Sequence, residues 1–186
     1  MKKLSKNRIL NGIWLLAVLL ILFTPIGFHV KVFINTVFAG RVDSLASENR
    51  KKLHDYHWQL TDIEENAFFF EQNKGKVVLI SFWATWCPPC IAEMPDLVSL
   101  YNDYHEKMVF MFVASDQRNH VINFLEKKAY EIPVYFQNSE APQLLNSERL
   151  PATYIIGKNG EIVVAEIGAA KWNSKKVTTL LDELLY

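Results

Sequence analysis

Residues 82–90 read Phe82-Trp83-Ala84-Thr85-Trp86-Cys87-Pro88-Pro89-Cys90 and hold the only two cysteines of the 186-residue chain. The run Val77–Trp83 is almost continuously apolar and rich in β-branched residues, which predicts a central strand buried on both faces. After Cys90, apolar residues recur at three- and four-residue spacing as far as Tyr104, which predicts an amphipathic helix. Cys87 is therefore expected where a strand gives way to a helix N-terminus, whose free N–H groups and dipole favour a thiolate.

Other interpretations of the cysteine pair are weaker. A c-type haem attachment needs His directly after the second cysteine, and the residue there is Ile91. A structural zinc site needs about four ligands, and neither a second cysteine pair nor a nearby histidine pair completes one. A purely structural bridge that closes so short a loop contributes only about 2 kcal/mol, and a chain of this length can bury a core without it. We therefore favour a redox-active dithiol, with no metal and no cofactor other than the Cys87–Cys90 disulfide itself.

Three motifs in order carry a family resemblance. The Trp-Cys-Pro-Pro-Cys segment is followed by Glu93-Met94-Pro95 and, about sixty residues later, by Leu150-Pro151-Ala152-Thr153. Over roughly residues 58–186 this order resembles the membrane-anchored, extracytoplasmic thioredoxin-like reductases of the TlpA and ResA type. The resemblance implies a thioredoxin fold. Thioredoxins proper carry a buried Asp six residues before the first cysteine, where this chain has Ser81; in the TlpA and ResA type a Glu three residues after the second cysteine serves instead, and Glu93 matches it.

The two cysteines and Glu93 form the predicted catalytic set together with Pro151. Cys87 is expected to attack, because the first cysteine of such a motif lies at the exposed helix edge, and Cys90 is expected to resolve. Glu93 follows Cys90 by three residues and can lie on the same helix face. If it is partly buried, its raised pKa lets it exchange a proton with a cysteine; a solvated helix carboxylate is the alternative.

The predicted substrate-binding residues are Trp86, Pro88 and Leu150. Pro151 is, by resemblance, a cis-proline that lies against the dithiol and presents the Leu150 backbone to an extended client peptide; an ordinary trans turn proline is the alternative. Trp86 is expected at the rim, as a shield for the sulfurs. Pro88 and Pro89 occupy the first helical turn and remove two N–H donors from the thiolate, which favours a reducing couple.

The N-terminal region predicts a membrane segment. Residues 1–8 are basic, and Ile9–Phe28 is an apolar run whose twenty residues would make a helix of about 30 Å, one bilayer core. A signal peptide is the alternative, but Val37-Phe38-Ala39, the candidate cleavage site, lies too far beyond the apolar run. We expect a single-pass anchor at 9–28, a cytoplasmic segment at 1–8, a juxtamembrane stalk at 29–57 and a thioredoxin-like domain at 58–186 on the periplasmic, extracytoplasmic side of the cytoplasmic membrane.

Strand and helix patterns alternate through the rest of the chain, as is typical of an α/β protein. The first part predicts a β-hairpin, Trp58–Ile63 with Ala67–Phe70, added before the central strand. Val109–Ala114 is the second buried strand, and Ser115-Asp116 can cap the helix that follows.

An extra αβ piece is expected next. It consists of the helix after Val109–Ala114, a strand at Pro133–Phe136 and a short helix at Ala141–Ser147. An Asn-Gly turn then joins Thr153–Ile156 to Ile162–Ile167 as a hairpin, and a last helix begins near Ser174. The predicted fold is α/β: a thioredoxin fold with an N-terminal β-hairpin and an αβ insertion, preceded by one transmembrane helix.

The net charge and the cysteine motif together limit the classes of function that the sequence allows. From residue 41 on, 15 basic and 20 acidic residues leave a net charge of about −5, so nucleic acid is not an expected partner. The expected activity is that of a protein-disulfide reductase acting on extracytoplasmic proteins. By resemblance, a membrane-embedded dithiol carrier is expected to supply its electrons, and apocytochrome c thiols are among the implied substrates. The alternatives are a thiol oxidase and a copper-binding thioredoxin-like protein, since soft thiolates suit Cu(I).

Overall fold

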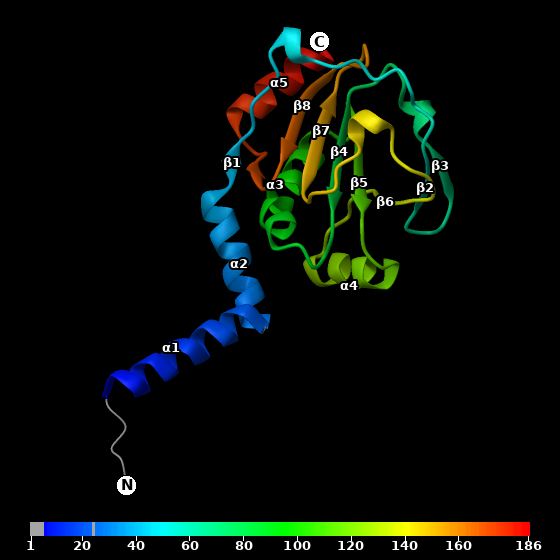
Figure 1. Cartoon of the computed structure of the whole chain (residues 1–186). Helices are drawn as coiled ribbons and strands as arrows, with labels where there is room; N and C mark the ends of the chain where they lie inside the picture. The colour runs from blue at the N-terminus through cyan, green and yellow to red at the C-terminus, as the bar shows by residue number, and fades with distance from the viewer. Residues whose placement is uncertain (1–5, 24) are drawn as a thin grey trace.

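The computed structural model describes residues 6–23 and 25–186 of the chain. Its centre is a seven-stranded sheet of mixed direction (Figure 1). The strands are β2 (Gln59–Asp62), β3 (Ala67–Phe69), β4 (Val78–Trp83), β5 (Val109–Ala114), β6 (Val134–Gln137), β7 (Ala152–Ile156) and β8 (Ile162–Ile167). Their order in the sheet is β3-β2-β6-β5-β4-β7-β8. β4 therefore lies inside the sheet, as its apolar sequence predicted.

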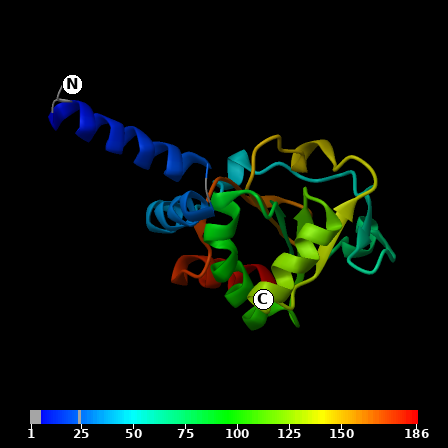
Figure 2. The same cartoon turned by 90° about the horizontal axis from the view of Figure 1, so that it is seen from below.

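Helices and a second, two-stranded sheet surround this centre. The helices are α1 (Lys6–Phe23), α2 (Pro25–Phe38), α3 (Pro88–Tyr104), α4 (Arg118–Lys128) and α5 (Lys175–Leu185), with short 3-10 helices η1 (Ser47–Asn49), η2 (Phe70–Asn73) and η3 (Gln143–Leu145). The small parallel sheet pairs β1 (Gly40–Arg41) with β9 (Ala170–Lys171). Figures 1 and 2 show α2 beside α3, whereas α1 extends away from the rest of the molecule.

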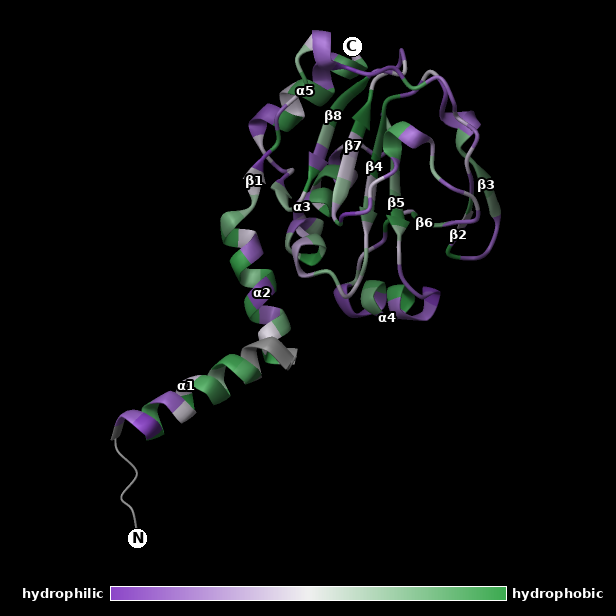
Figure 3. Ribbon diagram, viewed as in Figure 1, coloured by the Kyte–Doolittle hydropathy of each residue, from purple (hydrophilic) through white to green (hydrophobic). Residues whose placement is uncertain are grey.

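Two apolar clusters cover the two faces of the sheet because side chains alternate along each strand. On one face, Leu79 and Trp83 of β4 belong to a cluster that includes Leu97 of α3 and Leu181 of α5. On the other face, the alternate residues of β4 belong to a cluster that includes Trp58. All six residues of β4 are buried, and Figure 3 shows β4 and β5 coloured as hydrophobic over most of their length. Burial on both faces explains why the sequence of β4 does not alternate.

The predicted hairpin and the inserted strand are both present, but the short helix predicted at Ala141–Ser147 is reduced to the 3-10 helix η3 (Gln143–Leu145). β2 and β3 pair antiparallel, and β6 pairs with β5 in parallel and with β2 antiparallel. The inserted strand β6 is therefore what attaches the hairpin to the sheet. The final elements also follow the sequence: β7 and β8 form a hairpin, and the Ser174 hydroxyl accepts a hydrogen bond from the N–H of Val177 at the start of α5.

The predicted single-pass anchor over residues 9–28 is wrong. The apolar run is divided between two helices, since α1 ends at Phe23 and Pro25 begins α2. A proline cannot continue a preceding helix without losing a hydrogen bond and clashing with the previous turn. In the described ranges, neither α1 nor any other helix combines the length and the apolar character needed to cross a bilayer. The placement of a domain beyond the cytoplasmic membrane, which depended on that anchor, is withdrawn with it.

The segment predicted as a stalk, residues 29–57, lies against the domain. Val32 of α2 packs on the cluster that contains residues of α3, as does Phe28 just before the segment. Further along, the N–H of Leu53 donates to the carbonyl of Gly160 at 2.8 Å. The backbones of Lys52 and Glu161 form an isolated antiparallel β-bridge. Several separate contacts therefore join this segment to the sheet and its helices.

Candidate active site

The cysteine pair begins helix α3. Cys87 is the N-cap residue, and its sulfur accepts a hydrogen bond from the N–H of Cys90 at 3.3 Å. The two cysteines are joined by a disulfide. Pro88 and Pro89 hold the first two helical positions and have no N–H to offer, so the N–H of Cys90 is the first in the helix that can reach the sulfur. Both cysteines are almost buried in this oxidised form, Cys87 at 4% exposure and Cys90 at 1%.

The loop before Cys87 is fixed from the end of β5. A carboxylate oxygen of Asp116 accepts hydrogen bonds from both the N–H and the hydroxyl of Thr85. Its other oxygen accepts from the N–H of Gln117 at 2.7 Å and lies 3.2 Å from Nδ1 of His120. Burial alone would raise the pKa of Asp116, but the hydrogen bonds from these groups outweigh it and lower the pKa. The carboxylate therefore ties the active-site loop to the start of α4.

This contact differs from the predicted cap. Ser115-Asp116 was expected to cap the helix after β5, whereas the N-cap of α4 is Gln117, which makes no side-chain cap bond. One oxygen of the Asp116 carboxylate binds Thr85, because the parallel strands β4 and β5 bring their C-terminal ends together at one edge of the sheet, and the other binds the N–H of Gln117. Strand adjacency, which the local sequence does not encode, decided the partner.

Glu93 lies one turn beyond Cys90 on α3 and is only 2% exposed. Its Oε2 accepts two hydrogen bonds, one from the N–H of Ala170 and one from Nε1 of Trp172, each at 3.0 Å. Its Oε1 lies 3.5 Å from the hydroxyl of Thr153. Glu93 is therefore a buried carboxyl group held by β9 on one oxygen and by β7 on the other, and it is not solvated.

Burial raises the pKa of Glu93 to about 8, which makes a proton exchangeable near neutral pH. Hydrogen bonds from Trp172, Ala170 and Thr153 act in the opposite direction, and the negative charge of Glu166 raises the pKa further. The backbone amide and the indole can only donate, so Oε2 must accept. A proton on Glu93 therefore belongs on Oε1, facing Thr153.

A buried pair of hydroxyl groups continues from Oε1. Ser81 of β4 and Thr153 of β7 are opposite each other in the sheet, and their hydroxyl oxygens lie 3.0 Å apart. Both residues are buried. A hydroxyl donates one hydrogen and can accept others, so this pair can reorient when Glu93 gains or loses its proton. Ser81, at the position of the acidic residue in thioredoxins, thus joins the surroundings of Glu93 through Thr153.

Of the predicted substrate-binding residues, Trp86 and Pro88 adjoin Cys87 at the start of α3, and Leu150 precedes the proline of the Leu-Pro-Ala-Thr motif. The Leu150–Pro151 peptide bond is cis, as the resemblance implied. Pro151 is buried, whereas Leu150 is half-buried and contacts both apolar clusters. Trp86 is 61% exposed and Pro88 is half-buried, so both reach the surface beside the disulfide. An exposed indole next to a disulfide is suited to contact with a client protein.

Sequence reasoning missed Trp172, Ala170 and the Thr85–Asp116 pair. Trp172 is fully buried, but in the sequence it is an isolated aromatic residue ahead of the last helix. No spacing relates it to Glu93, 79 positions earlier in the chain. Thr153 was visible in the Leu-Pro-Ala-Thr motif, although its partner was not.

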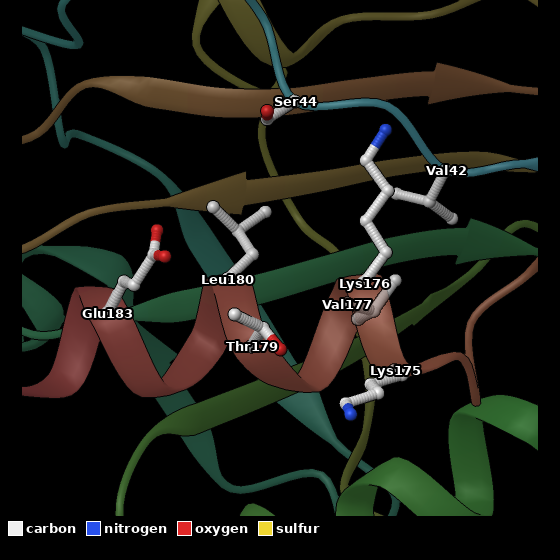
Figure 4. Close-up of a pocket in the computed structure, with 8 residues that line it drawn as sticks. All are labelled: Val42, Ser44, Lys175, Lys176, Val177, Thr179, Leu180 and Glu183. Atoms are coloured by element: carbon white, nitrogen blue, oxygen red, sulfur yellow. The ribbon is translucent and has the colours of Figure 1, made fainter.

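The residues lining the pocket in Figure 4 are separate from this site. They come from the segment after β1 and from α5 and are Val42, Ser44, Lys175, Lys176, Val177, Thr179, Leu180 and Glu183. In the part of the chain that the structure describes, no three His, Cys, Asp or Glu side chains gather in a way that could hold a metal ion.

The Redoxin family model matches residues 48–183, most of the chain and all of the elements that build the site. The chain belongs to the redoxin family. This redoxin is 36% identical over 104 residues to the thiol-disulfide oxidoreductase ResA of Oceanobacillus iheyensis, an alignment that covers 54% of each chain. It is 30% identical to the ResA of Geobacillus kaustophilus over 78% of this chain and 81% of that protein.

A solved structure of similar fold supports the same family assignment. The redoxin superposes with a TM-score of 0.59 on the crystal structure of a proposed thiol-disulfide oxidoreductase from Bacteroides vulgatus, at 30% identity, covering 69% of this chain and 92% of that one. The predicted thioredoxin-like fold and the resemblance to the TlpA and ResA type are confirmed. With a disulfide-forming pair at the start of α3, the redoxin is a thiol-disulfide oxidoreductase.

Proposed function

We propose that this redoxin reduces disulfides in client proteins by dithiol-disulfide exchange. The observation that carries the proposal is the pairing of two features on α3: a cysteine couple at the helix N-terminus and, one turn further, the buried carboxyl of Glu93. The first feature provides an attacking sulfur and a resolving sulfur, and the second provides a proton acceptor that works near neutral pH.

The first step is attack by Cys87. In the reduced enzyme its thiolate, at the N-cap and beside the N–H of Cys90, attacks one sulfur of the client disulfide. A new disulfide forms between Cys87 and the client, and the second client sulfur leaves as a thiolate that takes up a proton. The N-terminal end of α3 stabilises the attacking anion through the N–H of Cys90 and the helix dipole.

The second step is resolution by Cys90. Glu93 accepts the proton of the Cys90 thiol, the resulting thiolate attacks the sulfur of Cys87, and the client leaves with its second sulfur reduced. The proton then passes from Glu93 to the departing sulfur or to solvent. Two electrons have moved from the enzyme dithiol to the client, and the enzyme is left with its Cys87–Cys90 disulfide, the form described above.

The residues around the sulfurs bind the client protein. The exposed indole of Trp86 and the half-buried Pro88 offer apolar surface, and the backbone of Leu150, before the cis-proline Pro151, offers hydrogen bonds to an extended peptide. A second dithiol protein must reduce the enzyme again. By resemblance to the TlpA and ResA type, this donor is a membrane-embedded dithiol carrier and apocytochromes c are among the clients.

The reaction order is tested by trapping with the full chain and a model protein disulfide. Cys90→Ala should accumulate a mixed disulfide through Cys87, and Cys87→Ala should neither trap nor reduce. Trapping by Cys90 in the Cys87→Ala variant would reverse the two roles.

Glu93→Gln should slow resolution and remove the limb of the pH profile of disulfide reduction that belongs to Glu93. A Glu93→Gln profile that matches the wild type would exclude Glu93 from the proton transfer.

A further inference from the structure

The strand β9 and the residue that follows it supply both donors that hold Oε2 of Glu93. Ala170 in β9 donates its backbone N–H, and Trp172, directly after β9, donates its indole N–H. β9 belongs to a two-stranded sheet whose other member is β1. Its position therefore depends on a strand that precedes the region matched to the redoxin family, residues 48–183.

The pairing of β1 with β9 has a defined register. Gly40 is opposite Ala170 and Arg41 is opposite Lys171, and the N–H of Gly40 donates to the carbonyl of Ala169 at 2.8 Å. Because the N–H of Ala170 itself goes to Glu93, β9 is held by β1 on one edge and by the carboxylate on the other. Losing β1 would remove the backbone pairing that holds this strand on the edge opposite the carboxylate.

β1 is itself anchored on both sides. Val42, directly after it, is 3% exposed and belongs to the cluster that contains α3. Asp43 forms an ion pair with Lys176 of α5. Before β1, helix α2 packs against the same cluster. Figure 4 shows Val42 and Ser44, from the segment after β1, together with α5 around a pocket.

We propose that β1 is a positioning element of the active site, which fixes β9 so that the N–H groups of Ala170 and Trp172 converge on Oε2 of Glu93. The proposal rests on the proposed proton-accepting role of Glu93. Gly40 and Trp172 act through Glu93 and do not touch the reacting sulfurs, so they are positioning residues. With β1 displaced, the carboxylate loses stabilising donors and holds its proton to higher pH.

Charged side chains around Glu93 also bear on its pKa. Glu166 of β8 is the charged residue that raises the pKa of Glu93. On the paired strands, Arg41 of β1 and Lys171 of β9 are exposed. On α2, which packs beside α3, His29 is exposed and Lys31 is half-buried. None of these side chains is changed in the test.

The test compares the Glu93 titration in variants of the full, oxidised chain, in which the cysteines cannot titrate. Gly40→Pro removes the N–H that pairs with Ala169. Gly40→Ala is the matched control, because it keeps the N–H and its Cβ would meet the Ala169 carbonyl oxygen at 3.7 Å, an ordinary contact. Trp172→Phe removes one donor directly. Carbon-13 NMR of labelled glutamate carboxyls gives the pKa in each.

Gly40→Pro and Trp172→Phe should each raise the pKa of Glu93 by about one unit, the size expected for one lost hydrogen bond to a charged group. Gly40→Ala should leave it unchanged. If Gly40→Pro does not fold, Val42→Ala, which weakens the anchor of β1, should raise the pKa by less but in the same direction. The proposal is overturned if the folded β1 variant leaves the pKa at its wild-type value while Trp172→Phe shifts it. Failure of the proposed function is seen separately, as an unchanged pH profile of disulfide reduction in Glu93→Gln.

Discussion

At the residue scale, the chemistry of this redoxin depends on how few N–H groups reach one sulfur. Cys87 is the N-cap of α3, a position whose side chain usually accepts from the second or third helical residue. Pro89 holds the second position and has no N–H, so the bond from Cys90 is the one that the structure retains. A thiolate with fewer donors is less stabilised, which makes the dithiol form the stronger reductant.

The couple is therefore expected to be reducing, with a potential nearer the roughly −270 mV of thioredoxin than the roughly −120 mV of a strong oxidant. Equilibration of the full chain with glutathione measures it. A potential above about −180 mV would favour the oxidation of client thiols over their reduction.

Pro89→Ala should make the couple more oxidising by about 30–60 mV. The substitution supplies an N–H at the helical position that can donate to the Cys87 sulfur, and one hydrogen bond to a charged group contributes about 1.5–3 kcal/mol. Pro88→Ala is the control, because the N–H of the first helical residue does not point to the N-cap side chain. Equal shifts in the two variants would show that general relaxation of the loop, and not the new donor, sets the potential.

At the element scale, the active-site loop is joined to its neighbours by side chains at strand ends. The loop between β4 and α3 is held by Asp116, which follows β5, and the carboxyl group of Glu93 on α3 is held by β7 and β9. These contacts connect elements far apart in the chain. They make the geometry around the disulfide depend on the sheet and not only on the helix that carries the cysteines.

Asp116→Asn should destabilise the oxidised protein by about 1–3 kcal/mol at neutral pH, since it replaces a charged acceptor that Thr85 and Gln117 share. The pKa of Asp116 is lowered in the folded state, so this contribution is present above the usual Asp range and is lost as the pH falls through the folded-state pKa. Denaturant unfolding measures it. His120→Ala removes only an exposed partner and should cost less than about 1 kcal/mol; a cost as large as that of Asp116→Asn would contradict the account.

At the scale of the whole molecule, the buried carboxyl group of Glu93 couples stability to pH. The unfolded chain releases this proton near the ordinary value of 4.5, whereas the folded chain keeps it until a pKa of about 8. Between these values the folded state binds more protons, so folding stability falls as pH rises. The burial that raises the pKa of Glu93 to near neutral pH therefore also lowers the folding stability at neutral pH.

The unfolding free energy of the oxidised chain should therefore decline between pH 5 and pH 8, by at most about 1.4 kcal/mol per pH unit from this group. Glu93→Gln should remove most of the decline. Glu166→Gln should remove a smaller part of the decline, because the pKa of Glu166 is also raised by burial but the residue is half-exposed. An equal slope in wild type and Glu93→Gln would mean that Glu93 titrates like a solvated carboxylate.

The sequence by itself determined the local features of this protein. The apolar run of β4, the Cys-Pro-Pro-Cys start of α3, the β2–β3 hairpin and the αβ insertion were all predicted, because strand burial, helix periodicity and turn chemistry are short-range patterns. Ordered motifs also pointed to the family and to the disulfide pair. Hydropathy alone misjudged residues 9–28, since it does not weigh the break that Pro25 introduces between two helices.

Only the tertiary structure decided what surrounds the reactive groups. Glu93 could have been a solvated helix carboxylate; its burial and its bonds to Ala170, Trp172 and Thr153 come from strands that reach it from 60 to 79 positions away in sequence. The same holds for the Asp116–Thr85 contact and for the pairing of β1 with β9. Burial and hydrogen-bond partners set a pKa, and both depend on which strands become neighbours, a property of the packed sheet that no local pattern records.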